Sequence, residues 1–131
     1  MLYLKILFFL ISSFSWDSRS VSNDDYIVIF DRIDNSVEIL VNDSIVYQSG
    51  IIDNNPFLGD TYKIPLSIYL TEKKDEVIIR LYNGHPPYTE QSDTHWEIKY
   101  VIMNGDEQID YFWDYADDNQ VGLVFEEKYY F

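Results

Sequence analysis

The chain of 131 residues contains no cysteine, and it contains few basic residues. The first absence excludes disulfides, thiolate zinc sites, cysteine nucleophiles and lipid attachment through cysteine. Lys and Arg number 9 against 23 Asp and Glu, which gives a formal net charge of −14. Nucleic acids and anionic membrane surfaces attract basic residues, so the composition argues against both as partners. The acidity either serves solubility or indicates binding to a basic protein or to cations.

Apolar and aromatic residues, in contrast, are abundant. Hydrophobic residues make up 47% of the chain and aromatic residues 18%, with 12 Tyr, 8 Phe and 3 Trp. This content argues against disorder, and aromatic enrichment favours strands. The length suits one domain that is large enough to bury a core without covalent crosslinks.

The N-terminus carries a short apolar segment, Ile6–Ile11, with Lys5 as the only charge before Asp17. The segment is too short to span a bilayer comfortably, and small serine residues follow it. The pattern predicts a signal peptide at residues 1–15, a polar spacer at 16–25 and a domain at 26–131. The mature protein would then be secreted or periplasmic, without membrane insertion. A first buried strand of the domain and an uncleaved membrane anchor are the alternatives.

Beyond Asp25, short apolar segments alternate with turn residues at roughly ten-residue spacing. Residues 37–41 and 77–81 place apolar side chains at every second position, and residues 26–30 form a continuous apolar segment that suggests burial on both faces. The pattern predicts an all-β fold, a sandwich or a barrel, of about 7–8 short strands. In the alternating segment 62–70, Ile64, Leu66, Ile68 and Leu70 are expected on one face, and Pro65 predicts an edge strand or a bulge.

The strongest turn signal is Asn104-Gly105, the preferred pair of central residues in a type I′ hairpin turn. A two-residue turn at this place sets Met103 opposite Asp106. The segment 109–116 is then a strand, although a helix over Ile109–Ala116 is an alternative.

This register assigns the aromatic residues of the second strand to faces. Trp113 is expected to pair with Trp96, and Tyr111 with Ile98, on the inner face. Phe112 is then expected on the opposite face, together with Asp114.

From Val37 to Asn83 the chain shows a recognisable succession of strands and turns. It consists of "VEILVND-SIVY", "GDTYKIPLSIYL", the charged turn "TEKKDE" and "VIIRLYN". This succession resembles the galactose-binding-like jelly roll, a fold of carbohydrate-binding modules and of sugar-binding domains in some glycoside hydrolases. The resemblance implies an antiparallel, jelly-roll-like β-sandwich with a carbohydrate site in loops at one end. Asp43 stands where the family usually has Gly, so a wider hairpin is expected there.

The predicted hairpin brings the loop before Trp96 close to the loop after Trp113. Sugar sites combine an aromatic ring with amide or carboxylate groups, and both loops supply such side chains. The candidate ligand-binding residues are Asn83, Tyr88, His95, Tyr115, Asp117, Asp118 and Asn119. An ordinary pair of solvated loops is the alternative.

Asp114, Asp117 and Asp118 offer the oxygen ligands that calcium takes, and they form a candidate calcium site outside the helix-loop-helix pattern. No other cofactor is expected, and no catalytic motif indicates an enzyme. Two functions remain. One is an exported, non-catalytic module that binds carbohydrate through its end loops. The other is a small acidic protein, of inhibitor or immunity type, that recognises a basic protein.

Overall fold

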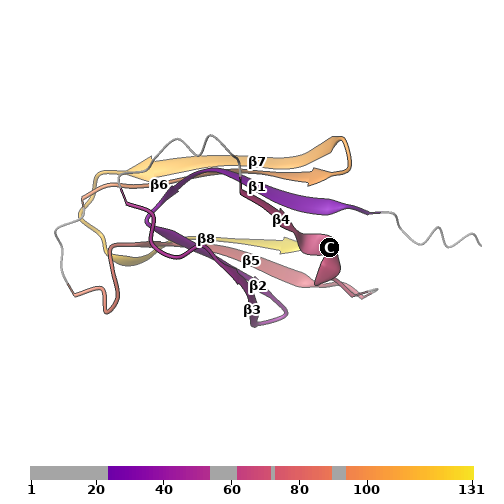
Figure 1. Ribbon diagram of the computed structural model, residues 1–131, viewed down its shortest axis with the longest axis horizontal. Helices are drawn as coiled ribbons and strands as arrows, with labels where there is room; N and C mark the ends of the chain where they lie inside the picture. The colour runs from indigo at the N-terminus through magenta and orange to yellow at the C-terminus, as the bar shows by residue number, and fades with distance from the viewer. Residues whose placement is uncertain (1–23, 54–61, 72, 90–93) are drawn as a thin grey trace, which may run out of the picture.

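The computed structural model describes residues 24–53, 62–71, 73–89 and 94–131. In these residues eight strands form two antiparallel sheets that face each other as a β-sandwich (Figure 1). The predicted all-β fold is therefore confirmed. The described residues include no helix long and apolar enough to cross a membrane. The predicted signal peptide, and the spacer up to residue 23, lie outside the described residues.

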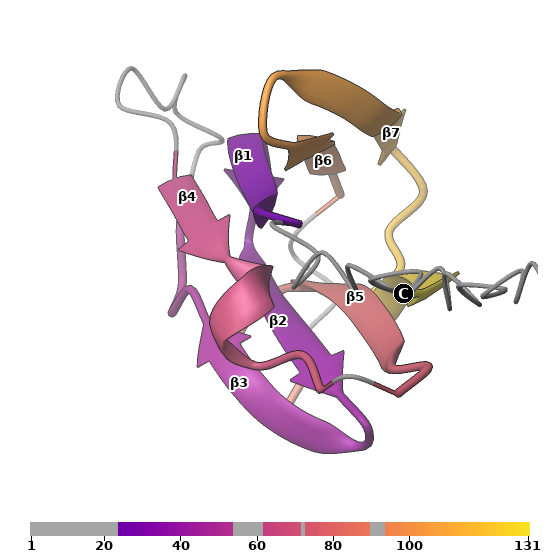
Figure 2. The same cartoon turned by 90° about the vertical axis from the view of Figure 1, so that its right-hand side faces the viewer.

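Each sheet has four strands, and the chain passes repeatedly between the two sheets. The first sheet has the order β4 (Tyr62–Pro65), β1 (Tyr26–Asp34), β6 (Trp96–Asn104), β7 (Glu107–Ala116). The second has the order β3 (Ser44–Gln48), β2 (Ser36–Val41), β5 (Glu76–Asn83), β8 (Gly122–Tyr130). Figure 2 shows β1, β6 and β7 on one side of the sandwich and β2, β3 and β5 on the other.

The core lies between the sheets and is built from alternate residues of the four inner strands. Phe30, Ile39, Ile79 and Ile98 are fully buried there, and burial of such a side chain contributes about 1.5–3 kcal/mol. In β1, Val28 and Phe30 point into the core, whereas Ile27 and Ile29 are half-buried on the outer face.

Strand β4 lies at the edge of its sheet, as Pro65 predicts. Directly after Pro65 the backbone enters a short 3₁₀ helix, η1 (Leu66–Ile68), so the strand does not continue to residue 70. Leu66 reaches the core, but Ile68 is 69% exposed. The predicted common face of Leu66 and Ile68 is therefore wrong, because a helical turn replaces the period of two.

The hairpin between β2 and β3 has a two-residue turn, because Val41 pairs with Ser44. Asn42 and Asp43 both have positive φ, at 48° and 66°, which is the pattern of a type I′ turn. Asp43 therefore adopts the conformation that Gly would take there, and the expected widening of the hairpin is absent.

The hairpin between β6 and β7 differs from the predicted one. Asn104 pairs with Glu107, so Gly105 and Asp106 are the central residues of the turn. The Asn104 side chain is used elsewhere: its oxygen accepts a 3.0 Å hydrogen bond from the Asp25 N–H, and its nitrogen donates one of 3.0 Å to Asp24.

A β-bulge follows the turn and decides which side chains of β7 face the core. Met103 pairs with Gln108, but Ile102 pairs with Asp110, so Ile109 is an extra residue in β7. The turn lies one position later than predicted. This difference alone shifts the partner of each β6 residue by two residues along β7, so the side chains of β7 would keep their predicted faces. The single extra residue reverses them for the rest of the strand.

The reversal places Phe112 inside, where its ring centroid lies 4.9 Å from that of Phe125. Trp96 pairs with Ala116, and Ile98 with Asp114. The predicted pairs of Trp96 with Trp113 and of Ile98 with Tyr111 are therefore wrong. The strand itself is present over residues 109–116, so the helical alternative does not hold.

Candidate functional site

Three exposed aromatic rings lie along the outer face of β7. Tyr111, Trp113 and Tyr115 are 48%, 51% and 57% exposed, and we call them the aromatic strip. Their alternate positions space them about 7 Å apart along the strand. The ring centroids of Trp113 and Tyr115 are 5.9 Å apart, with the planes inclined at 43°. Single exposed apolar side chains are ordinary, but a contiguous set on one face indicates an interaction site.

Trp113 is held in place by a buried carboxylate. Its indole N–H donates a 2.7 Å hydrogen bond to Oε2 of Glu97, on the neighbouring strand β6. The Glu97 side chain is only 7% exposed, and Nη1 of Arg32 lies 3.3 Å from its other oxygen. The ring is thus exposed to solvent while its orientation is fixed from below.

Lys99 lies beside the same ring. Its Nζ is 5.3 Å from the centroid of Trp113 and 2.9 Å from Oδ2 of Asp31. The hydrogen bond to Asp31 raises the pKa of Lys99, and the charge of Asp31 adds to this effect against the opposing effect of burial. The charged ammonium group therefore stabilises the ring by a cation–π contact.

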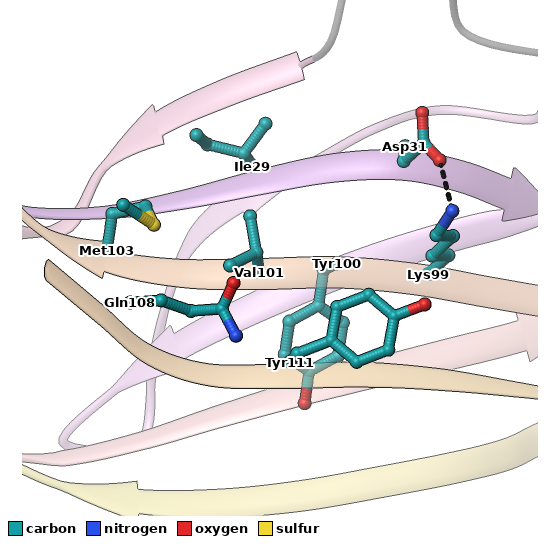
Figure 3. Close-up of a pocket in the computed structure, with 8 residues that line it drawn as sticks. All are labelled: Ile29, Asp31, Lys99, Tyr100, Val101, Met103, Gln108 and Tyr111. Carbon is teal, nitrogen blue, oxygen red and sulfur yellow. Dashed lines mark ion pairs between the residues drawn. The ribbon is translucent and has the colours of Figure 1, made fainter. Parts of the chain in front are cut away.

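An open groove adjoins the strip at Tyr111 and extends across β6 to β1. Its volume is about 330 Å³, and Ile29, Val101 and Met103 supply its apolar lining (Figure 3). Gln108 and the Lys99–Asp31 pair add polar groups to the same surface. Such a combination of apolar lining with a few polar groups is typical of small-molecule sites.

At the Tyr115 end of the strip, the loop before β6 meets the loop after β7. The Nδ1 atom of His95 lies 2.6 Å from Asp117, and its Nε2 atom lies 3.8 Å from Glu97. Burial lowers the pKa of His95. The hydrogen bond and charge of Asp117, together with the charges of Asp34 and Glu97, outweigh this effect, so the pKa is above its ordinary value. The predicted proximity of these two loops is confirmed.

Other predicted ligand-binding residues do not take part in the contact between His95 and Asp117. Asn83 is fully buried, and its side chain donates a 2.7 Å hydrogen bond to the carbonyl of Gln120. Tyr88 stacks on Tyr82 of the second sheet, with centroids 5.7 Å apart. Asn119 is exposed in the loop after β7, with a φ of 58°. The structure therefore brings His95, Tyr115 and Asp117 to one surface, whereas Asn83 is buried against the loop after β7 and Tyr88 packs on Tyr82 of β5.

The aspartates of the candidate calcium site have separate partners. Asp117 contacts His95, whereas Asp118 accepts a 3.2 Å hydrogen bond from the indole N–H of Trp96. Asp114 accepts one from the backbone N–H of Tyr115. Within the described part of the chain, no group of three or more His, Cys, Asp or Glu side chains is placed to hold a metal ion. The calcium hypothesis gains no support from this geometry.

The sequence-based prediction included His95, Tyr115 and Asp117 but not the remaining residues of this surface. Tyr111 and Trp113 had been assigned to the core, and Glu97, Lys99 and Asp31 had been assigned no role at a site. The groove was not predicted because its lining comes from three strands, β1, β6 and β7, and because the bulge places Tyr111 on the same face as Val101.

Comparison of the chain with protein-family models, with curated proteins and with solved structures found no match in any of the three.

Proposed function

We propose that this protein is a non-catalytic carbohydrate-binding domain whose binding surface is the aromatic strip with the adjoining groove. The observation that carries the proposal is the state of Trp113, which is 51% exposed while its N–H is tied to a buried carboxylate. A free surface residue has no need of such an anchor. A ring that binds a ligand benefits from such an anchor, because a fixed ring loses less conformational entropy on binding.

The chemistry of the surface suits a sugar. One face of a pyranose ring presents C–H groups that pack on an aromatic ring, and its hydroxyl groups need donors and acceptors at the sides. Here the rings supply the apolar surface, and Asp31, Lys99 and Gln108 supply polar groups nearby. The proposed surface lies on the face of the sheet, whereas the end-loop site was expected at the tip of the sandwich.

The two-sheet antiparallel sandwich is compatible with a jelly-roll-like fold. Membership of the galactose-binding-like family, and export through a signal peptide at residues 1–15, remain parts of the proposal that rest on sequence pattern. Both agree with a domain that meets glycans outside the cytoplasm.

A glycan array with and without calcium tests the proposal, followed by titration of any glycan that binds. Trp113→Ala should lower the affinity about tenfold or more, as expected for a central aromatic contact. Tyr130→Ala is the matched control, because Tyr130 is 58% exposed but belongs to the second sheet. Equal affinities of the wild type and Trp113→Ala for the bound glycan would refute the site.

A second candidate is recognition of a basic protein. It is favoured by four acidic residues near the turn of the β6–β7 hairpin, where Asn104 holds Asp24 and Asp25 beside Asp106 and Glu107. A salt-sensitive interaction with a basic protein that Trp113→Ala leaves unchanged, together with an empty glycan array, would establish this function and exclude the first.

A further inference from the structure

We infer that the ligand is a neutral, extended glycan chain that lies along β7, from Tyr115 across Trp113 to the groove beyond Tyr111. This inference rests on the proposed carbohydrate binding and specifies the class of glycan.

The layout of the strip indicates an extended chain. Its three rings occupy alternate positions of one strand, so the outer two are about 13 Å apart. The spacing between neighbouring rings is comparable to the length of one sugar unit in an extended chain, so each ring can pack on its own unit. Beyond Tyr111 the surface continues into the groove, where Met103 and Gln108 can contact a further unit. A site for a single terminal sugar would need one ring, not a row.

The charges beside the strip indicate a neutral ligand. Each basic side chain there already has a carboxylate partner: Lys99 has Asp31 at 2.9 Å, Arg32 has Glu97 at 3.3 Å, and His95 has Asp117 at 2.6 Å. A carboxylate, sulfate or phosphate on the ligand would have to compete with these pairs.

Among the described residues, one further basic side chain, Lys63, lies on this face. It faces outward because it pairs with the outward-facing Ile29. It belongs to β4, three strands away from β7, a distance of about 14 Å. The sugar units on the aromatic strip do not reach it; only a unit in the groove, which Ile29 lines, comes near β4. The net charge of −14 also repels polyanions at long range.

The test compares neutral oligosaccharides with acidic ones on the full chain. Binding is followed by calorimetry and by the change in tryptophan fluorescence in a Trp16→Phe background, in which Trp113 is exposed to the ligand and Trp96 is buried. The neutral probes are mono-, tri-, tetra- and hexasaccharides of the glycan class identified on the array, or of glucan, xylan and mannan if the array identifies none. The acidic probes are oligogalacturonate and a heparin oligosaccharide.

Affinity for the neutral series should rise about tenfold or more from mono- to trisaccharide and level off between tetra- and hexasaccharide. Tyr115→Ala and Tyr111→Ala should each weaken binding of the hexasaccharide more than binding of the monosaccharide, because each removes one end of the strip. Tyr130→Ala should change neither, and thermal unfolding confirms that each variant is folded.

The outcomes separate this inference from the proposed function. Tighter, Trp113-dependent binding of the acidic probes would overturn neutrality while the carbohydrate site stands. A monosaccharide that binds as tightly as the trisaccharide would overturn the extended chain. Failure of every probe to bind would overturn both the inference and the proposed function.

Discussion

The indole N–H of the exposed Trp113 is anchored by a 2.7 Å hydrogen bond to Glu97, whose side chain is only 7% exposed. The carboxylate in turn lies 3.3 Å from Arg32, so its charge is compensated on the same face. An exposed ring and a buried acid thus form one unit. The acid is stable there because it is paired, and the ring is ordered because the acid is fixed.

Glu97→Ala should loosen the strip and destabilise the fold. It leaves Arg32 and the Trp113 N–H without their acceptor, which is expected to lower the free energy of unfolding by about 1–3 kcal/mol. Glu97→Gln keeps one acceptor oxygen and should lose less than half as much. Urea unfolding measures the stability, and the fluorescence anisotropy of Trp113 measures its mobility. If both variants match the wild type, the anchor has no energetic role.

The register of β7 can be tested by two neighbouring substitutions. Phe112→Ala removes a ring that packs on Phe125 at 4.9 Å and on Tyr100 at 5.9 Å, so a loss of about 1–3 kcal/mol is expected. Tyr111→Ala removes an exposed ring and should cost about 0.5 kcal/mol or less. Thermal or urea unfolding decides between them. The reverse order would support the hairpin without the bulge.

The sequence alone predicted the sandwich because its signals were local and repeated. Alternate residues such as Ile39 and Ile79 point to the core at each strand, and turn residues separate the strands. Pro65 also predicted an edge strand for a physical reason, since it cannot donate a ladder hydrogen bond.

Such local signals did not predict which side chains of β7 face the core. Hydrophobicity favours the row of Tyr111, Trp113 and Tyr115 on the inside, over the mixed row of Phe112, Asp114 and Ala116. The pairing with β6 overrides it, because Ile109 adds one residue and reverses every later side chain. No turn residue marks that bulge. The turn also lies one residue later than predicted, and the Asn104 side chain binds Asp24 and Asp25 before β1 instead. These contacts join residues that are 80 and 79 positions apart in the chain, so no local pattern predicts them.

Asp43→Gly should stabilise the protein. Asp43 has a φ of 66°, a conformation that Gly adopts without the strain of a Cβ atom. A gain of about 0.5 kcal/mol is expected after the higher entropy of Gly in the unfolded chain is included. Asp106→Gly is the matched control, because Asp106 lies in the other hairpin turn and does not have a positive φ. Urea unfolding should show a gain for the first variant alone; a gain for both would point to charge removal instead.

The pKa of His95 should fall when Asp117 is replaced. Burial lowers this pKa, but the hydrogen bond and charge of Asp117 raise it above the ordinary value. Since the folded-state pKa is raised, the contribution of His95 to stability is complete below about pH 6.5 and is lost as the pH rises through the raised pKa. Titration of the imidazole by NMR should give a lower midpoint in Asp117→Asn than in the wild type. An unchanged midpoint would show that the contact is absent in solution.

Two tyrosines join the sheets near the open edge between β7 and β8. The Tyr129 hydroxyl donates a 2.7 Å hydrogen bond to Asp110 and lies 2.6 Å from the hydroxyl of Tyr100, which is 1% exposed. Burial raises the pKa of both tyrosines. For Tyr129 the hydrogen bonds with Tyr100 and Asp110 raise it further, whereas for Tyr100 the bond with Tyr129 partly opposes the increase.

These raised pKa values predict that the protein loses stability in alkaline solution. Below about pH 10 the contribution of both groups is complete. Above it the unfolded chain releases protons that the folded protein retains, so the free energy of unfolding falls as the pH rises towards the raised values. Tyr129→Phe should cost about 1–2 kcal/mol at neutral pH, because the buried Tyr100 hydroxyl loses its acceptor, and it should flatten the alkaline decline. Urea unfolding at about pH 7 and about pH 10.5 measures both effects, with the exposed Tyr130→Phe as the control. If stability declines as steeply with pH in Tyr129→Phe as in the wild type, the other tyrosines cause the alkaline decline and the prediction for Tyr129 is wrong.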